Sequence, residues 1–274
     1  MKSRTIAGAY GALCQKHPAF RKWTRRFMYQ FMARHARQRE WTFMNYGYAP
    51  LDDQTAMPEL HAADEYNRYP IQLYHHVVRA VKLLGADVLE VGSGRGGGAA
   101  YLRRYHRPQK MVGVDFSDHA VSFSREHHRD EGLHFVAGDA ENLPFGDNSF
   151  DAVVNVESSH CYGSMEGFLA QVRRVLRPGG AFLFADFRDR EHLERLDRQL
   201  DRSGLKVAEQ ADITPHALLA LDLDHERRLG LVRKAAPPWL LTLGQEFAGV
   251  KGSGIYDRFR LRTTVYQSFV LTKP

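Results

Sequence analysis

Short apolar runs alternate with segments of helical length from residue 86 onward. The runs are DVLEV, KMVGVD, LHFVAGD, FDAVVNV and AFLFADF, which begin at residues 87, 110, 133, 150 and 181. Strands buried on both faces are continuously apolar, and strand–helix alternation places helices on both sides of a parallel sheet. The pattern therefore predicts an α/β fold.

Further segments on both sides extend this order. Residues 70–84 predict an amphipathic helix, because four apolar residues share one stripe: Leu73, Val77, Val81 and Leu84. The string VRRVLRPGG predicts a helix end, where Pro178 and two glycines turn the chain into the strand that begins at residue 181. Near the C-terminus, SGLKVAEQADI and TTVYQSFVLTKP predict two more strands on either side of an apolar helical insertion.

The chain is long enough for one large domain with an insertion, since it has 274 residues, of which 43% are hydrophobic. The pattern divides it into four expected parts. They are an N-terminal helical lid (1–84), an α/β core (85–212), a helical cap insertion (213–260) and the final strand of the core (261–274).

Positive charge is concentrated in the first 40 residues. Ten Lys or Arg and one acid give this segment +9, whereas 28 basic and 31 acidic residues give the rest −3. Aromatic residues recur there at helical spacing, which predicts an amphipathic helix with a basic face: Phe20, Trp23, Phe27 and Phe31. Two interpretations stay open. The basic face is simply solvated above a docked apolar stripe, or residues 18–40 make peripheral contact with an anionic membrane or an amphiphilic ligand.

Composition narrows the function classes. The sequence has no run of about 18 apolar residues that would span a bilayer, and its start lacks an apolar stretch of signal-peptide length. Cys14 and Cys161 form neither a spaced metal motif nor a dense disulfide framework, so a cytoplasmic location is expected. Nucleic-acid binding is not expected, because the basic excess belongs to one segment and no recognition module is visible elsewhere.

A glycine-rich loop, GSGRGGGAAYL, directly follows the first predicted strand. Gly92, Gly94 and Gly97 satisfy G-x-G-x-x-G, and Asp115 ends the next strand 18 residues after Gly97. A turn without side chains lets a ligand touch the backbone, while an acid at this position accepts hydrogen bonds from ribose hydroxyls. Because dinucleotide dehydrogenases share this device, the loop alone predicts a nucleoside ligand and does not say which one.

Three more features favour S-adenosylmethionine. Glu90 precedes the loop, where a carboxylate can help to hold an ammonium group. Asp139 ends the third strand, where it can accept a hydrogen bond from an adenine amino group. The terminal strand after an insertion closes the sheet in the antiparallel direction, instead of starting a second dinucleotide-binding half.

The strings EVGSGRGGGAAYL, GVDFS, GDAENLPF, NVESSHCY and VRRVLRPGG, in this order and spacing, are similar to the class I S-adenosylmethionine-dependent methyltransferases. Within them the chain most resembles the phthiotriol and phenolphthiotriol dimycocerosate methyltransferases and related natural-product enzymes. The resemblance runs from about Trp41 nearly to the end of the chain, and residues 1–40 match less clearly. It implies a seven-stranded Rossmann-like sheet, with the acceptor covered by the N-terminal segment and the inserted helices.

The resemblance also implies roles for individual residues. The Gly92-Ser93-Gly94 turn is expected to meet the methionine part of the donor, and Asp115 its ribose hydroxyls. The remaining donor contacts that it implies are Phe116 beside the adenine, Asp139 and Ala140 at its amino edge, and Asn155 near the sulfonium.

NVESSHCYG, residues 155–163, contains the residue types of a catalytic triad or a metal site, but their spacing and the expected chemistry fit neither. A sulfonium donor is already activated, so no serine nucleophile is required, and the strained G-x-S-x-G elbow of a hydrolase is absent. His160 and Cys161 are consecutive and point apart on a helix, as do the other adjacent histidine pairs. No metal site is therefore expected, because zinc usually takes four spaced ligands.

The same string supplies a candidate base. An alcohol is a poor nucleophile until it loses its proton, and histidine titrates near the working pH, so His160 is the expected base. Glu157 lies three residues earlier, where it either orients the imidazole or stabilises positive charge. The alternatives are that His160 only shapes the pocket or caps a helix and that Glu157 is structural. Tyr46 and Tyr48 of MNYGY, with Trp239, are candidate acceptor contacts, although core packing is the favoured explanation for the tyrosines.

The leading functional hypothesis is methylation of a hydroxyl on a hydrophobic lipid, polyketide or other natural product. Carbon methylation of an isoprenoid or aromatic acceptor is the enzymatic alternative, with Glu157 facing a developing carbocation. A donor-binding module without transfer activity is the non-enzymatic one. The expected partner is a hydrophobic small molecule, and assembly into a homo-oligomer stays open.

Overall fold

A computed structural model describes residues 40–52, 54–235 and 241–274. The predicted basic helix, with its membrane-contact hypothesis for residues 18–40, and the acceptor candidate Trp239 lie outside the described residues. In the described ranges, no helix is both long enough and apolar enough to cross a bilayer.

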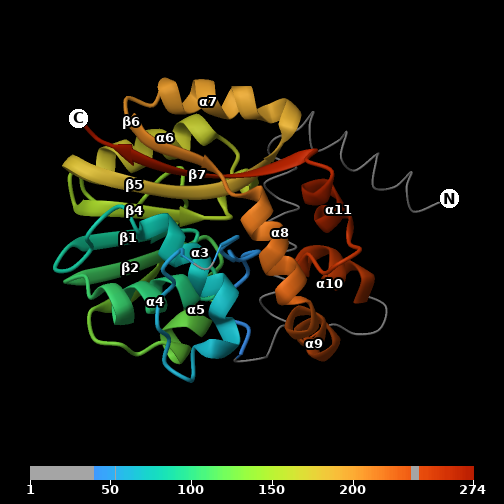
Figure 1. Ribbon diagram of the computed structural model, residues 1–274. Helices are drawn as coiled ribbons and strands as arrows, with labels where there is room; N and C mark the ends of the chain where they lie inside the picture. The colour runs from blue at the N-terminus through green and yellow to red at the C-terminus, as the bar shows by residue number, and fades with distance from the viewer. Residues whose placement is uncertain (1–39, 53, 236–240) are drawn as a thin grey trace.

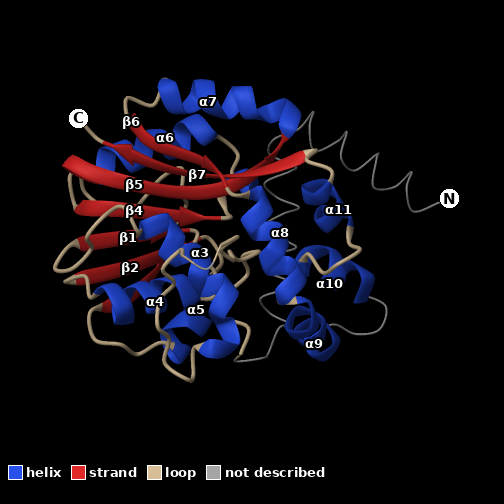
Figure 2. Ribbon diagram, viewed as in Figure 1, coloured by secondary structure: helices blue, strands red, loops and turns tan. Residues whose placement is uncertain are grey.

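A seven-stranded sheet forms the centre of the molecule, with strand order β3-β2-β1-β4-β5-β7-β6 (Figure 2). The first five strands are parallel, and β7 runs antiparallel between β5 and β6. Their bounds are β1 Asp87–Val91, β2 Lys110–Asp115, β3 Leu133–Ala137, β4 Phe150–Val156, β5 Leu176–Asp189, β6 Lys206–Asp212 and β7 Thr264–Thr272. The predicted fold class is confirmed, including the antiparallel closure by the terminal strand.

Helices cover both faces of the sheet and one of its ends. Residues alternate between the faces along each strand, so Val88 joins one core cluster and Leu89 the other. Helices α3 (Arg68–Val78) and α4 (Gly97–His106) pack into the first cluster, and α6 (Met165–Val175) and α7 (Leu193–Asp201) pack into the second. Helix α5 (Asp118–His127) contacts β2 and β3, and Ser117 caps its first turn.

The insertion is helical, as predicted. It forms α8 (Thr214–Leu223), α9 (His225–Ala235), α10 (Leu241–Ala248) and α11 (Gly254–Arg260). These helices gather at one end of the sheet, beyond the carboxyl ends of the parallel strands (Figure 1). The short 3-10 helices are η1 (Glu65–Asn67), η2 (Ser159–Cys161) and η3 (Arg190–His192).

Two predicted boundaries were wrong. The helix expected over 70–84 ends at Val78, and Leu84 is 59% exposed because the following turn directs Leu83 into the core instead. The Pro-Gly-Gly string does not precede β5 but lies inside it. There Gly179 takes a φ of 79°, and the register with β4 shifts between Phe150 and Ala152, so the string acts as an irregularity within the strand.

Candidate active site

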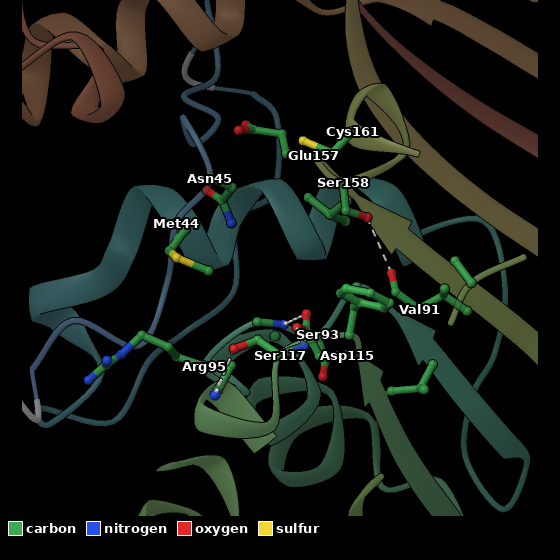
Figure 3. Close-up of a pocket in the computed structure, with 18 of the residues that line it drawn as sticks. Met44, Asn45, Val91, Ser93, Arg95, Asp115, Ser117, Glu157, Ser158 and Cys161 are labelled. Atoms are coloured by element: carbon green, nitrogen blue, oxygen red, sulfur yellow. Dashed lines mark hydrogen bonds between the residues drawn. The ribbon is translucent and has the colours of Figure 1, made fainter. Parts of the chain in front are cut away.

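A cavity of about 240 Å³ lies at the carboxyl ends of the central parallel strands (Figure 3). Segments that follow β1, β2, β3 and β4 form its floor and walls, which is the usual ligand position in an open parallel sheet. Residues 42–46, Tyr74 of α3 and two aromatic side chains from β5 and α10 also line it. The lining includes Met44, Tyr46, Gly92, Ser93, Gly94, Asp115, Phe116, Asp139, Ala140, Glu157, His160, Phe187 and Phe247.

The glycine turn after β1 requires its glycines. Gly92 and Gly94 have φ values of 77° and 52°, in the left-handed region that side chains disfavour. A Cβ at Gly92 would lie 2.3 Å from Ser158 Oγ, and one at Gly94 would lie 2.6 Å from Met44 Cε. Ser158 and Met44 therefore occupy the space that side chains at these positions would take, and the turn presents bare backbone to the cavity.

Backbone amides orient the two predicted acids. Asp115 accepts hydrogen bonds from the Gly94 and Ser117 amides, each at 2.8 Å. Burial raises the pKa of Asp115, and these backbone bonds oppose that shift. Asp139 accepts from the Glu141 amide at 3.0 Å. Both carboxylates line the cavity together with the glycine turn, Phe116 and Ala140, so seven of the nine predicted donor contacts converge.

The other two predicted donor contacts, Glu90 and Asn155, lie behind the cavity wall. Glu90 is fully buried and accepts a hydrogen bond from Tyr74 Oη, and burial raises its pKa to about 8. Asn155 donates to Val91 O at 2.8 Å and to Ser158 Oγ at 2.7 Å. Asn155 therefore holds the end of β1 against the segment that follows β4.

Glu157 and His160 both line the cavity, but the imidazole is not oriented by Glu157. Glu157 has a φ of 47°, and its Oε1 accepts from the Tyr46 amide at 2.6 Å and from Tyr266 Oη at 2.7 Å. The partner of His160 Nδ1 is Asp186, whose Oδ1 lies 2.7 Å away. The two side chains therefore have separate partners, because the chain forms only one short turn, η2, after Glu157.

Asp186 was missed in the sequence, although it stands in the apolar run AFLFADF. It accepts from Ser159 Oγ at 2.6 Å and from the His160 amide at 2.9 Å, and Arg188 Nη1 lies 3.0 Å away. Burial opposes ionisation, but His160 and Arg188 hold the pKa of Asp186 well below its usual range. Its position could have identified it, because a polar residue at the carboxyl end of a predicted parallel strand is a candidate site residue.

The protonation of the site follows from this pairing. Burial alone would lower the pKa of His160, but Cys161 and Asp186 outweigh it and raise the pKa to about 10. Burial raises the pKa of Glu157 to about 7, against the opposing hydrogen bonds from Tyr46 and Tyr266. At neutral pH the site therefore holds an imidazolium–carboxylate pair beside a carboxyl group that is close to its titration point.

The two tyrosines of MNYGY have different surroundings. Tyr46 lines the cavity, and its ring centroid lies 5.5 Å from that of Phe187. Tyr48 is stacked between His76 and His216, with centroids 4.4 Å away on each side, and is not among the cavity-lining residues. Packing between α3 and α8 therefore accounts for Tyr48. Phe187 and Phe247 line the cavity without having been predicted.

The chain matches known proteins over most of its length. A family model described as "Methyltransferase domain" matches residues 89–184. The "Fatty-acid O-methyltransferase" of Mycolicibacterium smegmatis is 38% identical, over 91% of this chain and 89% of that protein. The "Phthiotriol/phenolphthiotriol dimycocerosates methyltransferase" of Mycobacterium tuberculosis is 39% identical, over 90% of this chain and 91% of that protein.

The chain belongs to the class I S-adenosylmethionine-dependent methyltransferases. Among solved structures, geranyl diphosphate C-methyltransferase from Streptomyces coelicolor has a TM-score of 0.62, with 17% identity over 90% of this chain and 98% of that chain. At that identity the likeness concerns the fold. S-adenosylmethionine is the methyl donor of this methyltransferase, and the cavity suits such a donor through its bare glycine turn and its two oriented carboxylates. Among the described residues, no group of three or more His, Cys, Asp or Glu side chains could hold a metal ion.

Proposed function

We propose that this methyltransferase methylates a hydroxyl oxygen of a hydrophobic, lipid-like acceptor. The observation that carries the proposal is the position of His160 on the wall of the cavity that the Gly92–Gly94 turn also lines, with His160 Nδ1 2.7 Å from the buried Asp186 carboxylate. The names of the relatives, a fatty-acid O-methyltransferase and a dimycocerosates methyltransferase, support a lipid acceptor.

Donor binding is assigned to the residues that converge in the cavity. The Gly92–Gly94 turn would face the methionine part, Asp115 the ribose hydroxyls, and Asp139 with Ala140 the adenine amino edge, beside Phe116. Glu90 and Asn155 would act from behind the wall, by fixing the backbone that contacts the donor. When bound, the donor supplies a methyl group on a sulfonium, which needs no nucleophile from the protein.

His160 is assigned to the acceptor proton. Asp186 fixes the imidazole through Nδ1, and we assign the proton of an acceptor hydroxyl to Nε2. A positioned base contributes about 10²- to 10⁴-fold to the rate. A neighbouring positive charge disfavours the imidazolium, so a bound sulfonium would lower the pKa of His160 toward neutrality and favour the basic form.

The apolar part of the cavity supports a hydrophobic acceptor. Tyr46, Phe187 and Phe247 line it beyond His160, and Met44 reaches from residues 42–46 to the glycine turn. His160 itself packs against Phe187, with ring centroids 4.4 Å apart. An acceptor with an apolar body would bury that body against these rings and leave its hydroxyl beside the imidazole.

The experiment first identifies an acceptor by incubating the protein and labelled donor with a lipid extract from its source organism. Methyl transfer is then compared for wild type, His160→Ala and Glu157→Gln, with binding of S-adenosylhomocysteine measured by calorimetry as the folding control. We expect His160→Ala to lose about 10²- to 10⁴-fold in kcat while it still binds the nucleoside. If transfer survives His160→Ala but not Glu157→Gln, carbon methylation with a carboxylate beside the developing charge replaces this proposal.

A further inference from the structure

A buried arginine connects the helical insertion to the segment that lines the cavity. Arg228 on α9 is 5% exposed and does not itself line the main cavity. Its Nη1 donates to Ala248 O and its Nη2 to Asn45 O, both at 2.8 Å, and its Nε lies 2.9 Å from Asp224 Oδ2. One guanidinium therefore joins α9, the end of α10 and residues 42–46.

The Asn45 oxygen and the Tyr46 amide belong to the same peptide group. The amide donates to Glu157 Oε1 at 2.6 Å, while the oxygen accepts from Arg228 at 2.8 Å. Figure 3 shows Asn45 and Glu157 close together on one side of the cavity. A single buried peptide is thus held between a cation on its oxygen and a carboxylate on its nitrogen, an arrangement that strengthens both hydrogen bonds.

We propose that Arg228 is a positioning residue for the active site: from the insertion, it fixes the Asn45–Tyr46 peptide so that this peptide holds the Glu157 carboxylate. This inference rests on the proposed function in one respect, because the proposed function is what locates Glu157 beside the acceptor. Asp224 in turn holds Arg228, so the insertion is connected to the cavity through Asp224, Arg228, one peptide group and Glu157.

The physical consequence concerns the charge of Glu157. Without Arg228, the buried oxygens of Asn45 and Ala248 lose a donor, so the peptide turns and its amide moves away from Glu157. Burial then raises the pKa of Glu157 further above about 7, since the Tyr46 amide and the attraction to Arg228 both favour the carboxylate. The titratable and charged groups that also act on Glu157 are His160, Asp186, Tyr266, Tyr74 and Tyr46.

The test compares two neighbouring arginines. Arg227 also pairs with Asp224, at 2.6 Å, but its other partners are Asn67 and the ring of Tyr66, so Arg227→Met is the matched control for Arg228→Met. The carboxyl carbons of ¹³C-labelled glutamate are followed by NMR from pH 5 to 9, and Glu157→Gln identifies the signal of Glu157. This readout needs neither acceptor nor methyl transfer.

We expect Arg228→Met to raise the pKa of Glu157 by about one unit and Arg227→Met to leave it in place, since one unit corresponds to the loss of one modest hydrogen bond. Arg228→Lys keeps the charge but cannot donate to the Asn45 and Ala248 oxygens together, so it should shift the pKa of Glu157 by an intermediate amount. If Arg228→Met does not fold, the comparison is made with Arg228→Lys. Calorimetry with S-adenosylhomocysteine should give similar binding for all three variants. An unchanged titration in the Arg228 variants, or an equal shift in Arg227→Met, would overturn the inference, whereas a missing acceptor would affect only the proposed function.

Discussion

At the residue scale, the pairing of His160 with Asp186 predicts how activity depends on pH. Burial would lower the pKa of His160, but Cys161 and Asp186 raise it to about 10. Because only neutral imidazole accepts a proton, kcat for a hydroxyl acceptor should rise with pH through the neutral range.

Asp186→Asn removes the carboxylate that favours the imidazolium, so the rising limb of its profile should move to lower pH. Its maximal rate should fall about 10- to 100-fold, because the imidazole is no longer oriented. A wild-type profile that is flat through neutral pH would show an acceptor that ionises unaided, such as a carboxylic acid, and would remove the role of His160 as a base.

A second prediction at this scale concerns the glycine turn. Gly92→Ala places a Cβ 2.3 Å from Ser158 Oγ, which Asn155 and Tyr162 hold by hydrogen bonds, and does so at a positive φ. We expect a loss of about 1–3 kcal/mol in the free energy of unfolding and no measurable binding of S-adenosylhomocysteine. The control is Gly230→Ala in α9, where an added methyl meets no described atom within 4 Å and should stabilise the helix by about 0.5–1 kcal/mol. Urea unfolding and calorimetry of both variants give the comparison, and normal nucleoside binding by Gly92→Ala would contradict it.

The convergence of the residues that we assign to the donor was predictable, because it follows from the strand order. The glycine turn, Asp115 and Asp139 each follow a strand that an apolar run identifies, and the carboxyl ends of parallel strands converge. The surroundings of the residues that we assign to the acceptor were less predictable, since their contacts depend on where distant segments dock. Asp186 reaches His160 from β5, and Tyr266 reaches Glu157 from β7, and no local spacing in the sequence encodes either pair.

At the element scale, the apolar pattern predicted the bounds of several strands accurately and the bounds of the connecting helices and turns inaccurately. β1, β2 and β4 begin and end where their apolar runs do, because a strand buried on both faces is mostly apolar. The stripe over 70–84 runs past the end of α3, because its last two members, Val81 and Leu84, lie in the segment after the helix. There Leu84 is exposed and Leu83, which is not part of the stripe, is buried instead. In β5, Pro178 and Gly179 were interpreted as a turn, although a sheet accommodates such residues as an irregularity.

The end of α3 gives a prediction at this scale. Leu83 is 1% exposed in the turn after the helix, whereas Leu84 is 59% exposed. Leu83→Ala should therefore lower the free energy of unfolding by about 2–5 kcal/mol, and Leu84→Ala should change it by less than about 0.5 kcal/mol. Urea unfolding of the two variants measures both values. Equal losses would mean that the helical stripe predicted over 70–84 forms in solution.

At the scale of the whole molecule, the cavity is built from parts that are far apart in the sequence. Loops after four strands, residues 42–46, and aromatic residues from β5 and α10 all contribute to it. A ligand that fills this cavity would contact the core, residues 42–46 and the insertion at once. Binding is therefore expected to stabilise these parts together against unfolding.

This arrangement predicts a ligand effect on global stability. S-adenosylhomocysteine at 100 times its Kd should add about 2.7 kcal/mol to the free energy of unfolding, because it binds only the folded chain. For a chain of this size, such a gain raises Tm by several degrees, about 2–4 °C per kcal/mol. Nicotinamide dinucleotides should give no rise, since β7 closes the sheet where a second dinucleotide-binding half would begin. Thermal unfolding with each ligand tests both statements, with Gly92→Ala as the control that should not respond. Stabilisation by a nicotinamide dinucleotide equal to that by the nucleoside would mean that the two oriented carboxylates do not select the donor, and the assignment of Asp139 to the adenine edge would then be wrong.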